Sequence, residues 1–167
     1  DNVKAAFTNY DITALECVWN STGTVLGTKD VIEMLGSDSL ISLEGVGITK
    51  GVVTFQADID HPEDKESKIG VILGGSFGRK SGYGGMSIMY DSKTGVLEAL
   101  EGDESLGKAQ LANAGTMKSL SLMVVYRDGR YDIYANQSSE PVLAVETEKP
   151  NGGGVSLYSS NSSTLFY

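Results

Sequence analysis

The stretch GGSFGRKSGYGG, residues 74–85, holds the residue types of a catalytic turn. Its first five letters fit G-x-S-x-G, which presents a serine nucleophile at a turn from a strand into a helix, with Ser76 in that place. The residues that follow, RKSGYGGMSIMY, are typical of a loop entering another strand. The single histidine, His61, precedes Ser76 in a charged segment with no neighbour to orient its ring. We therefore expect Ser76 not to be catalytic.

Two further functional motifs, a phosphate-binding loop and a cysteine nucleophile, are not supported by the residues present. A phosphate-binding loop needs lysine directly after its second glycine, and here Arg79 stands between Gly78 and Lys80. Cys17 alternates with apolar residues in LECVW, which is typical of a buried small hydrophobic residue and not of a thiol nucleophile. Because it is the only cysteine, an internal disulfide is excluded.

Acidic residues form two clusters of different kinds. The segment DIDHPED, residues 58–64, concentrates oxygen ligands that Ca²⁺ accepts, although the spacing is not that of an EF-hand. We interpret it as a solvated loop, and a structural calcium ion is the only cofactor that the sequence leaves open. In EALEGDE, Glu98 lies in a predicted strand, whereas Asp103 and Glu104 lie in a predicted turn. Glycosidases need two carboxyl groups facing each other across a sugar, and we favour no hydrolytic role.

Composition limits the partners of the chain. Its 167 residues carry a formal net charge of −9, which disfavours nucleic acid and anionic membrane surfaces because both attract basic proteins. No apolar run approaches the roughly 18 residues of a membrane-spanning helix. We expect residues 1–167 to form a single module, excised from a larger multimodular protein.

Apolar and polar residues alternate along most of the chain, which is the period of half-buried strands. In VVTFQADID, residues 52–60, the apolar residues at odd positions would share one face. The pair Asp128-Gly129, between SLSLMVVY and RYDIYAN, is a strong hairpin signal. DVIEML, residues 30–35, fits either a short helix or a strand. Further predicted strands are SKIGVIL, GGMSIMYD, TGVLEALEG, PVLAVET, GVSLYSS and STLFY. The pattern predicts an all-β domain, a sandwich of two antiparallel sheets.

Aromatic side chains are the remaining functional signal. Eight tyrosines and one tryptophan are spread over predicted strands and turns, and rings with a polar edge suit sugar-binding clefts. Most of them are expected in the core, since Tyr131 shares a face with Ile133 and Ala135. Tyr134 falls on the opposite face. Tyr83, inside the glycine-rich stretch, has no periodic partner and is the best candidate for an exposed ring.

The order of these segments resembles a known family over about residues 50–167. It runs VVTFQADID, IGVIL, GYGGMSIMYD, GVLEAL, KSLSLMVVYRDGRYDIYAN, PVLAVET and GGGVSLYSSNSSTLFY. This is similar to the concanavalin-like jelly-roll modules of bacterial glycoside hydrolases, above all to carbohydrate-binding module family 66, the fructan- and levan-binding modules of family 32 glycoside hydrolases. The resemblance implies a jelly-roll fold and a non-catalytic sugar-binding role. Asp91 matches the family pattern, whereas Arg79 and Tyr83 are displaced along the chain from the family's arginine and tyrosine.

Our hypothesis from sequence is a carbohydrate-binding module for a polysaccharide or oligosaccharide, with a fructan-like ligand favoured. Tyr83 and Trp19 would stack on the sugar, and Arg79, Asp91 and Glu98 would supply hydrogen bonds. Two alternatives stay open: a structural or protein-interaction sandwich of a multimodular surface protein, and a glycan-active hydrolase domain that uses Glu98 and a second acid. The expected partners are a carbohydrate ligand and the other domains of the parent protein. The expected location is outside a bacterial cell or on its surface.

Overall fold

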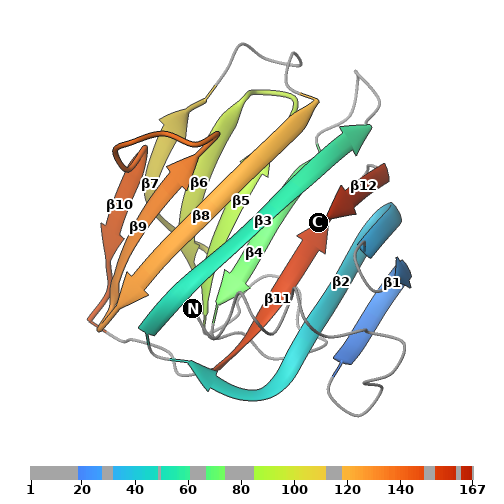
Figure 1. Ribbon diagram of the computed structural model, residues 1–167, viewed down its shortest axis with the longest axis horizontal. Helices are drawn as coiled ribbons and strands as arrows, with labels where there is room; N and C mark the ends of the chain where they lie inside the picture. The colour runs from blue at the N-terminus through green and yellow to red at the C-terminus, as the bar shows by residue number, and fades with distance from the viewer. Residues whose placement is uncertain are drawn as a thin grey trace.

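In the computed structural model the chain folds into two packed layers of antiparallel strands (Figure 1). The structure describes residues 19–27, 32–48, 50–60, 67–73, 85–111, 118–148, 153–160 and 163–166. These ranges contain twelve strands and no helix. The predicted all-β sandwich of two antiparallel sheets is therefore confirmed.

Four strands form the sheet of the first layer, in the order β10-β9-β8-β3. Their bounds are β3 (Lys50–Asp60), β8 (Ser119–Arg127), β9 (Arg130–Ala135) and β10 (Leu143–Glu146). Five strands form the sheet of the second layer, in the order β11-β4-β5-β6-β7. Their bounds are β4 (Lys68–Leu73), β5 (Met86–Asp91), β6 (Val96–Glu101), β7 (Glu104–Gln110) and β11 (Gly153–Ser159).

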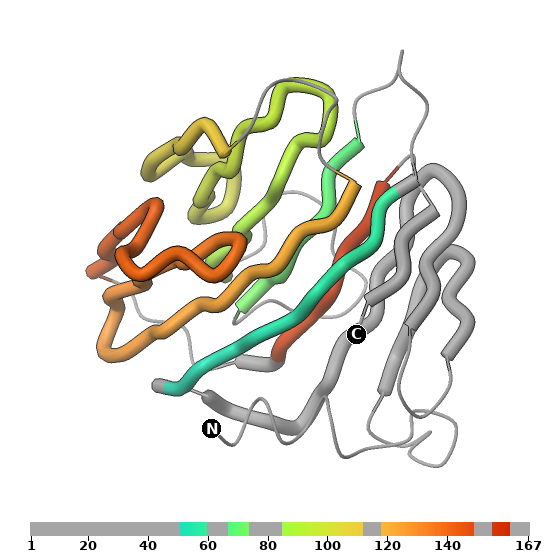
Figure 2. The backbone as a smooth tube through the Cα atoms, turned by 45° about the horizontal axis from the view of Figure 1, so that its top comes forward, coloured from blue at the N-terminus to red at the C-terminus, as the bar shows by residue number. Residues whose placement is uncertain are grey.

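Three strands join the layers along one side of the sandwich: β1 (Trp19–Gly27), β2 (Ile32–Ile48) and β12 (Ser163–Phe166). The first residues of β2 pair with β12, which pairs with β3, whereas its later residues pair with β11. β2 therefore passes from one layer into the other, and β1 pairs along it. At the opposite side, β10 packs against β7 (Figure 2).

Alternation along the strands fills the space between the layers. The predicted apolar face of β3 is buried, from Val53 to Ile59, while Gln56 of the same strand is exposed. The second layer contributes the other half of the core through alternate residues of β4, β5, β6 and β11. The core also holds two stacked tyrosines, Tyr126 and Tyr131, whose ring centroids lie 5.8 Å apart. Burial raises the pKa of both phenols, as apolar surroundings disfavour the charged form.

Two parts of the sequence prediction were wrong. The helical alternative for DVIEML fails, because from Ile32 onward the chain is in β2, where strands pair on both sides. The segment ESLGKAQ, residues 104–110, forms the edge strand β7, which the sequence did not predict. It lacks clear alternation because most of its side chains are exposed and its register with β6 shifts between Ala99 and Leu100. Glu104 opens this strand and does not lie in the turn.

The hairpin between β8 and β9 follows the sequence prediction. Asp128 and Gly129 have φ values of 51° and 86°. A two-residue turn of the type that matches the twist of the strands needs positive φ at both positions, and Asp followed by Gly meets that need at low cost. The predicted polar turn DSKTG, residues 91–95, likewise joins β5 to β6, and the Gly95 N–H donates to the Asp91 carbonyl over 2.8 Å.

Gly70, in the middle of β4, is a point of close backbone approach. It pairs with Met89 of β5, and a methyl group on its Cα would overlap the carbonyl oxygen of Ile88. That obstacle is backbone, which cannot move without disturbing the β4–β5 ladder. Gly107 of β7 differs, since a methyl group there would meet the end of the flexible Leu143 side chain at 2.9 Å.

We expect Gly70→Ala to lower the free energy of unfolding by about 2 kcal/mol, because the added carbon must displace a paired strand. Gly107→Ala is the matched control and should cost clearly less, because a leucine side chain can turn away. Urea denaturation followed by circular dichroism measures both. Equal losses for the two variants would contradict the close approach at Gly70.

Candidate functional site

The outer face of the second layer carries two parallel rows of side chains that cross the strands. Cross-strand pairing places Lys68, Asp91 and Val96 opposite one another in the first row. It places Met89 of β5 and Glu98 of β6 next to each other in the second row, which Lys108 of β7 continues. The residues of β4, β5 and β6 in these rows have the opposite parity to the core residues of the same strands, so they point away from the core. Lys108 pairs with Glu98 across the strands and so lies on the same face.

A depression of about 310 Å³ lies over these rows. Its lining comes from four neighbouring strands and from the turn between β5 and β6. The lining residues are Lys68, Met89, Asp91, Thr94, Val96, Glu98 and Lys108. The depression thus combines two carboxylates, two ammonium groups and an apolar floor in one place.

Each carboxylate of the depression faces a lysine on the neighbouring strand. The Lys108 Nζ lies 3.3 Å from Glu98 Oε2, and Lys68 pairs directly opposite Asp91. The Lys93 backbone N–H donates to Asp91 Oδ1 over 2.9 Å, which fixes this carboxylate at the start of the turn. Its other oxygen carries no further bond within the described part of the chain. The lining is therefore balanced in charge, although the whole protein is strongly acidic.

The apolar floor of the depression belongs to a small cluster outside the main core. Met89 and Ile72 are almost fully buried on the outer face, and Tyr158 of β11 packs against them. Ile69, Val71 and Leu73 of β4 point to the other face and are buried in the main core. The near-continuous apolar run KIGVIL is the signal of a strand covered on both faces.

Serine side chains hold the ends of the strands at the rim of the depression. The Ser67 hydroxyl donates to the Ser160 carbonyl over 2.8 Å, and the Ser160 hydroxyl accepts from the Lys68 N–H over 3.1 Å. The Ser92 hydroxyl donates to the Ser67 carbonyl over 3.3 Å. Ser67 and Ser92 are buried. These bonds tie β4, β11 and the β5–β6 turn together, so the lining residues have a rigid frame.

The structure brings two of the five predicted site residues together. Asp91 and Glu98 both line the depression. Trp19 opens β1, where its backbone pairs with Leu43, and its side chain lies outside the described part of the structure. Arg79 and Tyr83 lie outside the described residues, so their predicted roles stay predictions.

Several other sequence predictions fall outside the described residues as well. They concern Ser76, His61, Cys17 and most of the acidic segment 58–64. Leu73, the last residue of β4, pairs with Met86, the first residue of β5. That pair is five residues from the Lys68–Asp91 pair, or about 17 Å along the strands. The two points where residues 74–84 join the sheet therefore lie at the far end of these strands from the depression.

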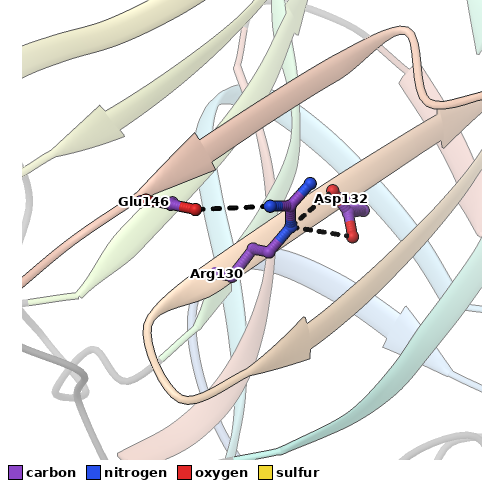
Figure 3. A network of polar contacts seen from close by, with 3 residues as sticks. All are labelled: Arg130, Asp132 and Glu146. Atoms are coloured by element: carbon purple, nitrogen blue, oxygen red, sulfur yellow. Dashed lines mark hydrogen bonds and ion pairs between the residues drawn. The ribbon is translucent and has the colours of Figure 1, made fainter.

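The outer face of the first layer holds a polar network of a different kind (Figure 3). The Arg130 Nε lies 3.3 Å from Asp132 Oδ1, and its Nη1 lies 3.3 Å from Glu146 Oε1. The hydrogen bond to Asp132 and the charge of that carboxylate raise the pKa of Arg130. These groups satisfy one another on a largely exposed surface, an arrangement typical of a solvated sheet face.

The described residues form neither a cluster of metal ligands nor a membrane-spanning helix. In these ranges no group of three or more His, Cys, Asp and Glu side chains is arranged to hold a metal ion. The same ranges contain no helix long and apolar enough to span a bilayer.

Comparison with known proteins gives matches in structure but not in sequence. No family model and no curated protein matches the chain. Carbohydrate binding module CBM66 from Bacillus subtilis has a TM-score of 0.66 at 15% identity, covering 89% of this chain and 91% of that chain. The legume lectin-like domain from Entamoeba histolytica has a TM-score of 0.61 at 14% identity, with 94% and 92% covered. The chain has a lectin-like fold.

A ligand-bound structure shares the same lectin-like fold. The exoplasmic/lumenal domain of VIP36, in its form bound to Ca²⁺ and Man3GlcNAc, has a TM-score of 0.61 at 12% identity, covering 90% of this chain and 83% of that chain. The concanavalin-like architecture expected from the order of segments is confirmed by these matches. At such identities the lectin-like fold is what the proteins share, and the depression must be judged on its own residues.

We expect Ser67→Ala to lower the free energy of unfolding by about 1 kcal/mol, because it removes a partly buried hydrogen bond that joins the start of β4 to the end of β11. Glu98→Gln should change it by less than about 0.5 kcal/mol, because the Lys108 side chain of the ion pair is 65% exposed. Urea denaturation of the two variants makes the comparison. A larger loss in Glu98→Gln would mean that the ion pair serves folding and not the site.

Proposed function

We propose that this domain is a non-catalytic carbohydrate-binding module that holds a saccharide in the depression on the outer face of the second layer. The depression itself carries the proposal, since it brings paired charges and an apolar floor together on a lectin-like fold. Carboxylate oxygens accept hydrogen bonds from sugar hydroxyls, and lysine ammonium groups donate to them. The half-buried Val96, with the small exposed part of Met89 beside it, offers a surface for the apolar side of a sugar ring.

The charge balance of the lining favours an uncharged sugar. Two lysines and two carboxylates cancel, so a uronic acid or a sulfated sugar gains no net attraction there. A fructan-like ligand is the favoured case, supported by the match to CBM66 and by the position of Asp91 in the family pattern. The parent protein would be a secreted bacterial glycan-degrading enzyme or a surface protein, to which the module supplies affinity for the polysaccharide.

A hydrolytic role is less favoured by the geometry. A glycosidase needs one carboxyl group that keeps its proton and can donate it to the glycosidic oxygen, commonly in an apolar setting. Both acids of the depression are partly exposed, and each has an ammonium group on the neighbouring strand. Release of reducing sugar from levan, inulin or a mannan by the isolated domain would overturn the non-catalytic assignment.

We expect Asp91→Asn and Glu98→Gln each to weaken saccharide binding by about 10- to 100-fold, because each removes a charged acceptor for a sugar hydroxyl. Affinity electrophoresis in gels that contain levan, inulin or mannan shows which polysaccharide retards the wild-type domain. Calorimetric titration with that polysaccharide then measures the loss of affinity. Asp132→Asn is the matched control, since Asp132 is also half-buried on an outer face but belongs to the first layer. Unchanged affinity in both depression variants would place the binding site elsewhere.

The loop of residues 74–84 is tested separately. If Arg79 and Tyr83 contribute as the sequence predicts, Arg79→Ala and Tyr83→Ala should each weaken binding by about tenfold, because a cation and a ring are lost. The same calorimetric titration applies, with Lys118→Ala, an exposed lysine just before β8 of the first layer, as the control for loss of a surface cation. Full affinity in both loop variants, together with loss in the depression variants, would confine the site to β4–β7.

A further inference from the structure

We propose that Tyr158 forms a second saccharide subsite beside the depression, so that the domain binds a segment of linked sugar units more tightly than one unit. The inference rests on the proposed function and deepens it, because it names the ligand class as an oligosaccharide segment. Tyr158 is not among the lining residues of the depression. It lies two strands away from Met89, which is one of the lining residues.

The backbone register puts Tyr158 in line with the depression. Tyr158 pairs with Gly70, Gly70 pairs with Met89, and Met89 pairs with Glu98. These four residues form one row across β11, β4, β5 and β6, and Lys108 of β7 extends it. Neighbouring strands are about 4.8 Å apart, so the Tyr158 backbone is roughly 10 Å from that of Met89. One sugar ring is about as wide as one strand spacing, so this row has room for a second ring.

Gly70 is the reason that an aromatic ring can join this row. It has no side chain, and the close approach of Ile88 allows none. An aromatic residue opposite a glycine in a sheet covers the bare backbone, and Gly70 is indeed buried. The Tyr158 side chain packs against Ile72 and Met89 and remains half-buried. Its inner side therefore lies on this cluster, and its remaining exposed surface faces outward.

Met89 links the two halves of the surface. It belongs to the cluster under Tyr158 and also lines the depression. A sugar unit held by Asp91 and Glu98 would have its neighbour in the chain directed over Gly70 toward Tyr158. A ring with an apolar face and a polar hydroxyl edge is suited to that neighbour. The charged rows would hold the first unit, and the tyrosine would add affinity for the second.

If Tyr158 served only to pack against its neighbours, its variants would behave differently from those of a sugar-stacking residue. Leucine would also cover Ile72 and Met89, but it has no aromatic face on which a sugar can stack. Tyr158→Leu thus keeps the packing and removes the platform. Tyr158→Phe keeps the ring and loses only the hydroxyl. Tyr134→Leu is the control, because Tyr134 is a half-buried tyrosine on the outer face of the first layer.

The test is calorimetric titration of the full chain with fructose and with levan-type oligosaccharides of two to four units, alongside mannose and the matching manno-oligosaccharides. We expect the wild-type affinity to rise by about tenfold from one unit to two or three in the series that binds. Tyr158→Leu should lose this rise and keep the affinity for the single unit. Tyr158→Phe and Tyr134→Leu should keep the rise.

The outcomes separate the subsite from the proposed function. Equal wild-type affinity for one unit and for several would overturn the subsite and leave the function standing, and so would a rise that survives in Tyr158→Leu. Absence of binding to every sugar in both series would overturn the proposed function and the subsite with it. Circular dichroism verifies that Tyr158→Leu is folded, and Tyr158→Met, with a flexible apolar side chain, takes its place in the titration if it is not.

Discussion

The surface of the second layer depends on the register between β4, β5 and β6. Side chains alternate between the two faces of a strand, so a slip of one residue exchanges the faces. Such a slip in β6 would bring Glu98 into the core and turn Leu97 and Ala99 outward. Burial of these apolar residues thus sets the position of the carboxylate. The core positions the site.

The same layer must satisfy two environments at once. Its inner face contributes to the main core. Its outer face carries the closely packed side chains of Ile72, Met89 and Tyr158 and is hollowed by the depression toward β7. The serine bonds at the rim and the bonded turn between β5 and β6 fix the ends of these strands without apolar contacts. A polar frame around a small apolar floor is well suited to a ligand that itself carries hydroxyl groups and an apolar face.

How much could be predicted differs between the elements. β3, β8 and β9 were predictable because their alternation is regular and the Asp128-Gly129 turn permits one local geometry. β7 was not, because an exposed edge strand has no apolar stripe to reveal it. Among the site residues, Glu98 was found from its place in a predicted strand, and Asp91 from its match to the pattern of the family that the sequence resembles. Lys68 and Lys108 were missed, because a lysine on a strand face looks solvated until its neighbours are known.

The sequence by itself determined the class of fold, the core face of most strands and the turns that depend on local backbone conformation, because these follow from patterns within a few residues. The tertiary structure decided which strands are neighbours. Lys68, Glu98 and Lys108 meet on one surface because β4, β6 and β7 follow one another across the sheet, and Tyr158 joins them from β11 although it is sixty residues further along the chain than Glu98. Pairing between segments that are distant in the sequence sets this strand order. The order depends on the combined burial of all the strands, and no local signal in the sequence selects it.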